Sequence, residues 1–292
     1  MPDVVTTVAD VRARLDAARS AGRRVGFVPT MGFLHAGHES LIEHAARDDD
    51  VVVTSIFVNP LQFAPTEDLA AYPRDPEGDA SRAAAAGCDL LFTPSVDEMY
   101  PDGRDAVLTT VAVPALAAVM EGASRPTHFA GVCTVVAKLL NVVGPCAAYF
   151  GEKDYQQLAI VRRMVCDLSF PVEVVGCPTV REPDGLALSS RNVYLTGEER
   201  EVAPVLHRAL RSGADAVAGG ETDASAVRAR MAAVVGAAPL GELDYVEVAV
   251  PDRLHPLERV GGDARLFGAV RFGRARLIDN VAASAPAEGS LR

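Results

Sequence analysis

Two histidines three residues apart are the most informative feature of the sequence. His35 and His38 stand in the stretch PTMGFLHAGH (29–38), directly after an apolar run, with Gly32 before them and Gly37 between them. Glycines let a backbone approach a small bound group closely, and the N–H groups at a helix N-terminus bind anions. We therefore interpret the imidazoles as donors to a phosphate. The alternatives are zinc ligation, for which no third His or Cys is suitably grouped, and a purely structural turn.

Two further cationic groups follow other predicted elements. Lys153 comes directly after a predicted strand, in GEKD, and Arg191 follows Ser189 and Ser190 in LALSSRN. A lysine at the start of a helix, or a guanidinium beside two hydroxyls, is suited to phosphate oxygens. Each group alone is more typical of a solvated loop. Together with the histidines they predict a cationic pocket for a polyphosphate, within a chain whose net charge is −11.

Three neutral amides are predicted at the same edge of the fold. Asn59, Gln62 and Gln157 are donors and acceptors at once, so they suit a small substrate with hydroxyl groups. Each one taken alone is equally compatible with an ordinary loop amide. Neither GxxxxGK[ST] nor GxGxxG occurs, so the sequence predicts neither a P-loop NTPase nor the common dinucleotide fingerprint.

These residues follow the strands of a predicted α/β domain. The segments 24–30 and 50–60 are near-continuous apolar runs, with a helical pattern over 38–47 between them. Such runs are typical of parallel strands covered on both faces. We therefore predict a doubly wound, Rossmann-like parallel sheet, with its ligand site beyond the carboxyl ends of the strands.

The same alternation of strands and helices continues to about residue 179. A polar loop over 121–131 is expected to precede one of the helices. The other expected elements are helices over 7–21, 79–86, 132–143 and 154–168, and strands over 89–94, 146–151 and 172–180.

The pattern changes after residue 179. A charged helix is expected from Thr196, and a small antiparallel sheet from 243–250 and 265–279. We therefore predict a nucleotide- and substrate-binding domain over 1–179 and a smaller α+β domain over 180–292. The last ten residues, 283–292, have the composition of a disordered tail.

Composition limits the partners and the compartment. Apolar residues make up 49% and charged residues 23% of the 292 residues, as in ordinary soluble domains. The acidic balance disfavours nucleic acid, which needs a basic footprint. No run approaches the roughly 20 apolar residues that cross a membrane, and the N-terminus has no apolar block typical of a secretory signal. Five scattered cysteines are expected to be reduced thiols of a cytoplasmic enzyme.

A resemblance to known enzymes adds to this interpretation. A strand followed by His-x-Gly-His is similar to the signature of class I aminoacyl-tRNA synthetases and nucleotidylyltransferases, which act on the α-phosphate of ATP. A longer series of motifs, in order from residue 29 to 280, resembles the pantoate–β-alanine ligase family. The motifs are PTMGFLHAGH, SIFVNPLQF, YPRD, EGASRPTHFAGV, FGEKDYQQL, PTVREPDGLALSSRNVYL and RLIDN.

The resemblance implies a reaction in two steps. The carboxylate of (R)-pantoate attacks ATP to give pantoyl adenylate and pyrophosphate, and the amine of β-alanine then displaces AMP to give pantothenate. It also implies Mg²⁺ and a homodimer. Because acyl adenylates hydrolyse readily, the second domain is expected to act as a lid.

The resemblance also assigns residues. Gln62 and Gln157 are expected to hold pantoate, Gln62 also to meet β-alanine, and His38 to donate a proton. His35, Lys153 and Arg191 are the other catalytic candidates. The implied ATP-binding residues are Met31, Gly32, Phe33, Leu34, His35, Ala36, Gly37, His38, Gly151, Glu152, Lys153, Asp154, Val180, Leu188, Ser189, Ser190 and Arg191.

Two positions depart from the family pattern. Gly78 stands where some members have an acidic residue linked to Mg²⁺, which leaves Asp79 as the expected metal ligand. Ala130 stands where relatives often carry arginine.

Three other functions remain as alternatives. A nucleotidylyltransferase for a phosphorylated acceptor is disfavoured by the amides, a tRNA synthetase by length and acidity, and a regulatory ATP-binding module by the intact set of cationic residues.

Overall fold

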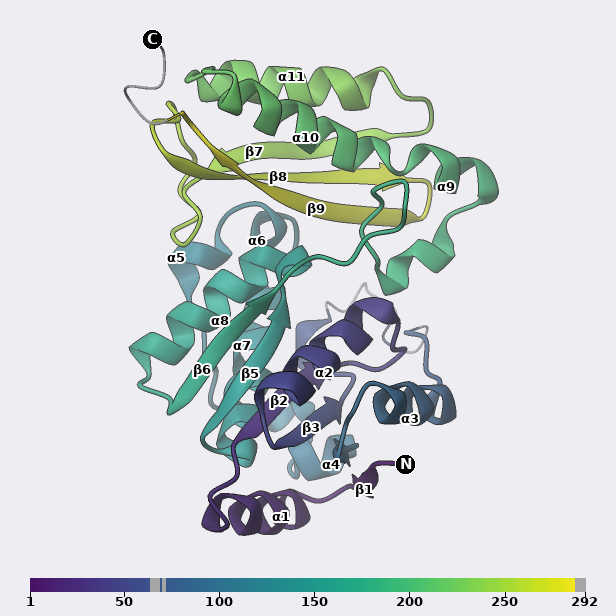
Figure 1. Ribbon diagram of the computed structural model, residues 1–292, viewed down its shortest axis with the longest axis vertical. Coiled ribbons are helices and arrows are strands. Elements are labelled where there is room, and N and C mark those ends of the chain that lie inside the picture. Colours follow the sequence, from purple (N-terminus) through teal and green to yellow (C-terminus); the bar gives the residue numbers. More distant parts are fainter. Residues whose placement is uncertain (64–68, 70–71, 287–292) are drawn as a thin grey trace. The chain divides into compact units, whose positions relative to one another are not determined.

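The computed structural model describes residues 1–63, 69 and 72–286. Two compact units make up the chain, each with its own sheet (Figure 1). The first unit comprises Met1–Glu152 and Gln156–Pro178, and the second Lys153–Tyr155 and Thr179–Arg292.

Six parallel strands form the sheet of the first unit, in the order β1-β4-β3-β2-β5-β6. The chain moves outward from β2 through β3 to β4, and then returns to the other side of β2 with β5 and β6. This order confirms the doubly wound parallel fold, whose topological switch point lies between β2 and β5. The strands are β1 (Asp3–Val5), β2 (Val25–Thr30), β3 (Val51–Ile56), β4 (Leu90–Phe92), β5 (Cys146–Gly151) and β6 (Val172–Cys177).

Helices cover both faces of this sheet. Side chains at alternate strand positions, such as Val28, Val52 and Tyr149, pack with α2 and α3, while α1 packs against α7 and β2. The helices are α1 (Val8–Ser20), α2 (Ala36–Asp48), α3 (Pro76–Ala85), α4 (Val96–Met99), α5 (Pro114–Ala117), α6 (Glu121–Ser124), α7 (His128–Val143) and α8 (Tyr155–Asp167). Short 3₁₀ helices are η1 (Pro60–Gln62), η2 (Arg104–Ala106) and η3 (Glu152–Asp154).

Several sequence-based boundaries differ from the structure; the strand expected over 50–60, for example, ends at Ile56. The loop expected over 121–131 contains α6 and the first turn of α7. Gly131 suggested a loop, but it lies inside α7. The position requires glycine because a Cβ there would collide with the carbonyl of Leu61. The strand expected over 172–180 ends at Cys177, before a proline that has no N–H to donate. The three-residue strand β1 was missed, because it is too short to show a periodic pattern.

The second unit contains a three-stranded antiparallel sheet, as the sequence predicted, in the order β7-β8-β9. Its strands are β7 (Glu242–Ala249), β8 (Asp263–Phe272) and β9 (Ala275–Ser284), and its helices are α9 (Gly197–Val202), α10 (Val205–Ala218) and α11 (Ala224–Gly236), with the 3₁₀ helix η4 (Ser190–Tyr194). Helices α10 and α11 pack their buried side chains against the sheet. The expected tail over 283–292 begins too early, since β9 includes Ser284; residues 287–292 lie outside the described part.

Two other sequence expectations can be compared with the described residues. No helix in this part of the chain is long and apolar enough to cross a membrane. All five cysteines are free thiols. Burial raises the pKa of Cys133 and Cys177 to about 11, so these two thiols stay protonated near neutral pH.

Candidate active site at the carboxyl end of the sheet

The paired histidines lie at the carboxyl end of the central strand. Strand β2 ends at Thr30, and α2 begins at Ala36 with His35 as its N-cap. Its neighbour β5, across the switch point, ends at Gly151. Doubly wound sheets bind ligands in the crevice outside this point. The topology of the first unit therefore predicts a ligand site at the carboxyl ends of the strands, where the sequence motifs also lie.

His35 and His38 cap α2 reciprocally. The Nδ1 atom of His35 accepts a hydrogen bond from the N–H of Gly37 at 3.1 Å, and Nδ1 of His38 accepts one from the N–H of His35 at 3.4 Å. The ring centroids are 4.2 Å apart. A ring nitrogen that accepts a hydrogen bond carries no proton, so each neutral imidazole has its proton on Nε2. The Nε2–H groups are therefore donors at the positive end of the helix dipole, as an anion requires.

This cap changes one part of the sequence interpretation. We expected main-chain N–H groups at the start of α2 to bind the anion directly. The N–H of Gly37 instead donates to the His35 ring, and the N–H of His38 donates to the carbonyl of His35 at 2.7 Å. The main-chain N–H groups at these two positions are therefore already used within the cap.

Asp79 fixes the turn that leads from β2 to the histidines. Its side chain is buried, and its two oxygens accept hydrogen bonds from the N–H groups of Phe33, at 2.9 Å, and Leu34, at 2.6 Å. Phe33 has a φ of +51°, which is uncommon for a residue with a side chain. Gly32 has a φ of +84°, and a Cβ there would lie 2.9 Å from Oδ2 of Asp79. The carboxylate thus stabilises a strained turn through close backbone contacts.

The same contacts bear on the expected metal ligand. Both oxygens of Asp79 already accept main-chain hydrogen bonds. Gly78 has no carboxylate, and a Cβ there would collide with the Asp75 side chain that caps α3. Within the described residues, no three His, Cys, Asp or Glu side chains are grouped to hold a metal ion. This part of the chain does not fit a dedicated protein site for Mg²⁺.

Asn59 and Gln62 lie together after β3. The Oδ1 atom of Asn59 accepts from the N–H of Leu61 at 3.3 Å and from the hydroxyl of Tyr100 at 2.8 Å. Its Nδ2 donates to Oε1 of Gln62 at 3.2 Å and to the carbonyl of Gly131 at 3.1 Å. These four bonds use the full capacity of the amide. One of the four bonds joins Asn59 to Gln62, the other amide that the sequence predicted at this edge of the sheet.

Gln62 connects the loops that follow β3 and β2. Its Nε2 lies 2.8 Å from Sδ of Met31. Its main-chain carbonyl accepts a hydrogen bond from Nδ1 of His128 at 3.0 Å, from the first turn of α7. The structure thus brings Gln62 and Met31, two of the predicted site residues, into direct contact.

The neighbouring glutamines of α8 have different surroundings. Gln156 is buried, its Nε2 donates to the carbonyls of Leu116 and Val119 at 2.9 and 2.8 Å, and its Oε1 accepts from the N–H of Glu121 at 3.0 Å. Gln157 is half-buried, and its amide makes no hydrogen bond to any described residue. Of the pair, only Gln157 keeps its full hydrogen-bonding capacity for a ligand.

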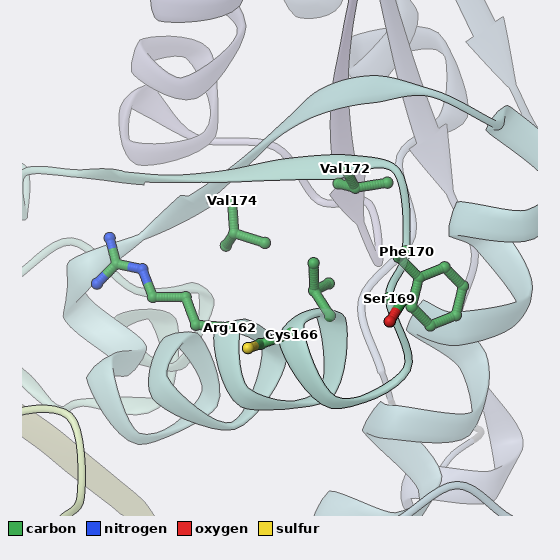
Figure 2. A pocket seen from close by; sticks show the side chains of 7 residues that line it. Arg162, Cys166, Ser169, Phe170, Val172 and Val174 are labelled. Carbon is green, nitrogen blue, oxygen red and sulfur yellow. The ribbon is translucent and has the colours of Figure 1, made fainter.

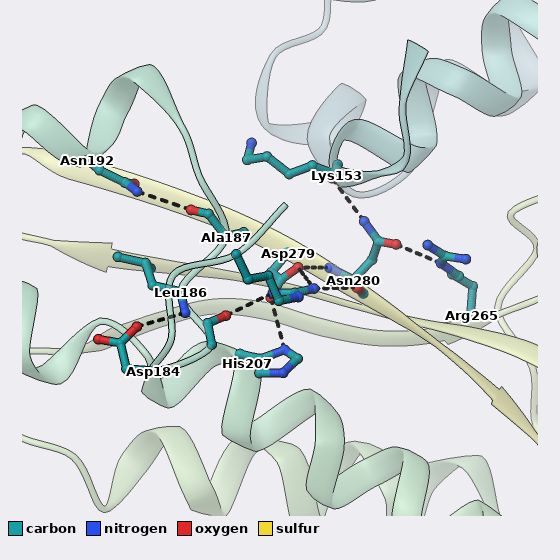
Figure 3. A network of polar contacts seen from close by, with 11 residues as sticks. Lys153, Asp184, Leu186, Ala187, Asn192, His207, Arg265, Asp279 and Asn280 are labelled. Carbon is teal, nitrogen blue, oxygen red and sulfur yellow. Dashed lines mark hydrogen bonds and ion pairs between the residues drawn. The ribbon is translucent and has the colours of Figure 1, made fainter. Parts of the chain in front are cut away.

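Lys153 belongs to the second unit, although it follows the last residue of β5 by only two positions. Its Nζ lies 3.3 Å from Oδ1 of Asp154, and its side chain is 15% exposed. Its main-chain carbonyl accepts a hydrogen bond from Nδ2 of Asn280 at 2.9 Å (Figure 3). Asn280 is the last residue of the motif RLIDN, and its residue type and position in the sequence indicated no role.

The segment with the predicted serine–arginine clamp is also in the second unit. Val180 and Leu188 are paired, since the N–H of Leu188 donates to the carbonyl of Val180 at 3.0 Å. Ser189 then caps η4 by accepting from the N–H of Arg191 at 3.3 Å. The guanidinium of Arg191 is exposed and makes no hydrogen bond or ion pair with the described residues. It is a cation suited to an anionic ligand.

A pocket elsewhere in the first unit does not share this chemistry. Figure 2 shows that it lies between α8 and the first half of β6, and so away from the carboxyl ends of the strands. Among the described residues that line this pocket, the guanidinium of Arg162 is the only charged group. Its lining residues are Arg162, Val165, Cys166, Ser169, Phe170, Val172 and Val174.

The doubly wound sheet with His-x-Gly-His after its central strand defines a class, the Rossmann-like nucleotidyltransferases. Within that class, the family model described as pantoate-beta-alanine ligase matches residues 3–282. The chain therefore belongs to the pantoate–β-alanine ligase family and is an enzyme. A pantothenate synthetase of Chloroflexus aurantiacus is 56% identical over 278 residues, which cover 95% of this chain and 96% of the relative.

Solved structures extend the likeness to three dimensions. The crystal structure of pantothenate synthetase from Thermus thermophilus is 52% identical with a TM-score of 0.89, covering 96% of this chain and 98% of the other. A pantoate-beta-alanine ligase from Francisella tularensis, complexed with beta-gamma ATP and beta-alanine, is 34% identical with a TM-score of 0.78, covering 96% and 97%. Both support the assignment of the fold.

Proposed function

We propose that this protein condenses (R)-pantoate with β-alanine in an ATP-dependent reaction, giving pantothenate, AMP and pyrophosphate. The observation that carries the proposal is the reciprocal cap, which leaves His35 and His38 with protons on Nε2 at the switch point of the sheet. Family membership identifies the acid and the amine. The complex of the Francisella tularensis relative with beta-gamma ATP and beta-alanine supports both ligands.

The first step forms a pantoyl adenylate. An oxygen of the pantoate carboxylate attacks the α-phosphorus of ATP, and the bond from that phosphorus to the bridging oxygen breaks, so that pyrophosphate leaves with the electron pair. A carboxylate and a triphosphate repel each other, so donors and cations must offset charge as the bonds change. The Nε2–H groups of His35 and His38 supply donors where pyrophosphate departs.

The second step forms the amide bond. The neutral amine of β-alanine attacks the acyl carbon, the carbon–oxygen bond to AMP breaks, and the nitrogen loses a proton. Gln62 and Gln157 hold pantoate through both steps, and Gln62 also contacts β-alanine. The unused capacity of the Gln157 amide supports this role. We assign Asn59 to the support of Gln62.

Phosphate binding extends to further residues. Met31 to His38, Gly151 to Asp154, Val180, and Leu188 to Arg191 contact ATP, as the motif resemblance implies. In the second unit, Arg191 is the best supported of these, because its guanidinium is exposed without a described partner. Lys153 is the other cation of that unit in the set.

Four further proposals rest on the family resemblance. Mg²⁺ enters with ATP, held by phosphate oxygens and water as is usual for this ion, and Asp79 serves the turn. Two copies of the chain form a homodimer. The enzyme works in the cytoplasm, where its free thiols stay reduced. The second domain serves as a lid over the adenylate.

Exchange of labelled pyrophosphate into ATP tests this function. With pantoate and Mg²⁺ present and β-alanine absent, we expect exchange, because adenylation precedes binding of the amine. A phosphorylated acceptor offered in place of pantoate should give none. Exchange that strictly requires β-alanine would contradict the two-step mechanism, and exchange only with the phosphorylated acceptor would favour a nucleotidylyltransferase.

A further inference from the structure

The three residues Lys153–Tyr155 are held by the sheet of the second unit. Nδ2 of Asn280, on β9, donates to the carbonyl of Lys153 at 2.9 Å. The guanidinium of Arg265, on β8, lies over the ring of Tyr155 at 4.0 Å. Phe267 meets the same ring at a centroid distance of 5.9 Å. The segment Lys153–Tyr155 is thus held by residues more than 100 positions away.

The side-chain amide of Asn280 is suited to this contact because it can donate one hydrogen bond and accept another at the same time. While Nδ2 donates to Lys153, Oδ1 accepts from Nε of Arg265 at 2.6 Å (Figure 3). Asn280 is 3% exposed, so water does not replace a lost partner easily. A carboxylate in its place would keep the bond to Arg265 but would face the carbonyl of Lys153 without a proton to donate.

The adjacent residue, Asp279, holds a second segment of the chain. Its carboxylate accepts two hydrogen bonds from Arg181, at 2.6 and 2.8 Å, and lies 3.5 Å from Nδ1 of His207. Arg181 pairs with Ala187 in the turn that leads to η4. Since the N–H of Asn280 also donates to Oδ1 of Asp279 at 2.7 Å, the two clamps form one network.

We infer that Asn280 is a positioning residue for Lys153, and that the pair Asp279–Asn280 holds Lys153 in register with the segment that carries Arg191. The inference rests on the proposed function, in which both cations bind phosphate. It gives the last residue of the motif RLIDN a role beside the ATP motifs. In this inference Asn280 affects adenylation through its hydrogen bond to the backbone of Lys153, so its effect depends on the ammonium that the backbone carries.

A double-mutant cycle tests this dependence. Asn280→Asp should lower the single-turnover rate of adenylation by about 5- to 10-fold, the effect of one lost hydrogen bond. In a Lys153→Met background, the same change should lower the rate less than about twofold, because no ammonium remains to be positioned. Ser284→Ala is the matched control, since it removes a bond from β9 to Asp263 that does not reach Lys153. It should leave the rate unchanged.

Two outcomes would overturn the inference. One is an undiminished adenylation rate in folded Asn280→Asp; the other is the full loss from Asn280→Asp persisting in the Lys153→Met background. If Asn280→Asp fails to fold, Asn280→Ser is put through the same cycle with the same expectations. Wild-type enzyme that shows no pantoate-dependent exchange would contradict the proposed function instead, so the two failures are distinguishable.

Discussion

His35 and His38 form a single cap, in which each imidazole accepts a main-chain hydrogen bond through Nδ1. The consequence is chemical as well as structural. Fixing Nδ1 as an acceptor leaves Nε2 as the donor on both rings. In the proposed function, these two Nε2–H groups donate to a phosphate without any change of tautomer, and preorganised donors of this kind stabilise developing negative charge.

Asp79 should act through the turn and not through the metal. Asp79→Asn keeps the size of the side chain but replaces one acceptor with a donor, facing the N–H of Phe33 or Leu34. We expect adenylation to slow by about 10- to 100-fold, since hydrogen bonds to charged groups contribute about 1.5–3 kcal/mol each. The measurement is the adenylation rate as a function of Mg²⁺ concentration.

The defect should persist at saturating Mg²⁺. Glu77→Gln, an exposed substitution in the first turn of α3, is the control and should behave like wild type. Recovery of the Asp79→Asn rate at high Mg²⁺ would instead identify Asp79 as a metal ligand.

Neighbouring glutamines offer a matched pair. Gln157→Ala should raise the KM for pantoate and leave the free energy of unfolding nearly unchanged, because its amide has no described partner. Gln156→Ala should do the reverse. It leaves the carbonyls of Leu116 and Val119 without their donor, which we expect to cost about 1–3 kcal/mol of stability. Urea unfolding and steady-state kinetics on both variants separate the effects, and a stability loss in Gln157→Ala alone would refute the assignment.

Asp279 should make stability depend on pH. Burial alone raises the pKa of its carboxyl, but the nearby His207 side chain, the hydrogen bonds from Arg181 and the charge of Arg181 outweigh this and hold the pKa below the ordinary 3.8. The unfolded chain therefore binds the proton more tightly than the folded one. The resulting stabilisation is present above about pH 3.8 and is lost as the pH falls through the lower, folded-state pKa.

The contribution of the Asp279 carboxylate to stability can be measured by unfolding the wild-type protein and the Asp279→Asn variant over a range of pH. The difference in unfolding free energy between wild type and variant should be constant near neutral pH and should shrink only as the pH falls below about 3.8. Asp252→Asn, an exposed substitution in the same unit, is the control and should show no such change. A difference that grows as the pH falls would have the wrong sign for this account.

Local patterns were sufficient to predict the sheet and the position of the histidine turn. The apolar runs of β2 and β3, and the glycines around His35, are signals carried by a few consecutive residues. The reciprocal cap also lies within four residues, but the nitrogen used by each ring depends on orientation, which spacing does not determine.

Support from distant residues could not be predicted from the sequence. Asp79 lies 46 positions from Phe33, and Asn280 lies 127 positions from Lys153. No periodicity relates positions so far apart. The surroundings of Asn59 could not be predicted for a related reason: its four partners come from three separate segments of the chain, and only their combination shows that the amide is fully used.

The central claim, that the histidine donors serve the departure of pyrophosphate, is tested most directly on His38→Ala. Single-turnover quench-flow should show adenylation slowed by about 10²–10³, the usual effect of losing one preorganised donor. His38→Gln should recover part of the rate if hydrogen-bond donation is the role. The same His38→Ala enzyme, given synthetic pantoyl adenylate and β-alanine, should form pantothenate at nearly the wild-type rate, because no pyrophosphate leaves in that step. An equally slow reaction from the preformed adenylate would contradict the account.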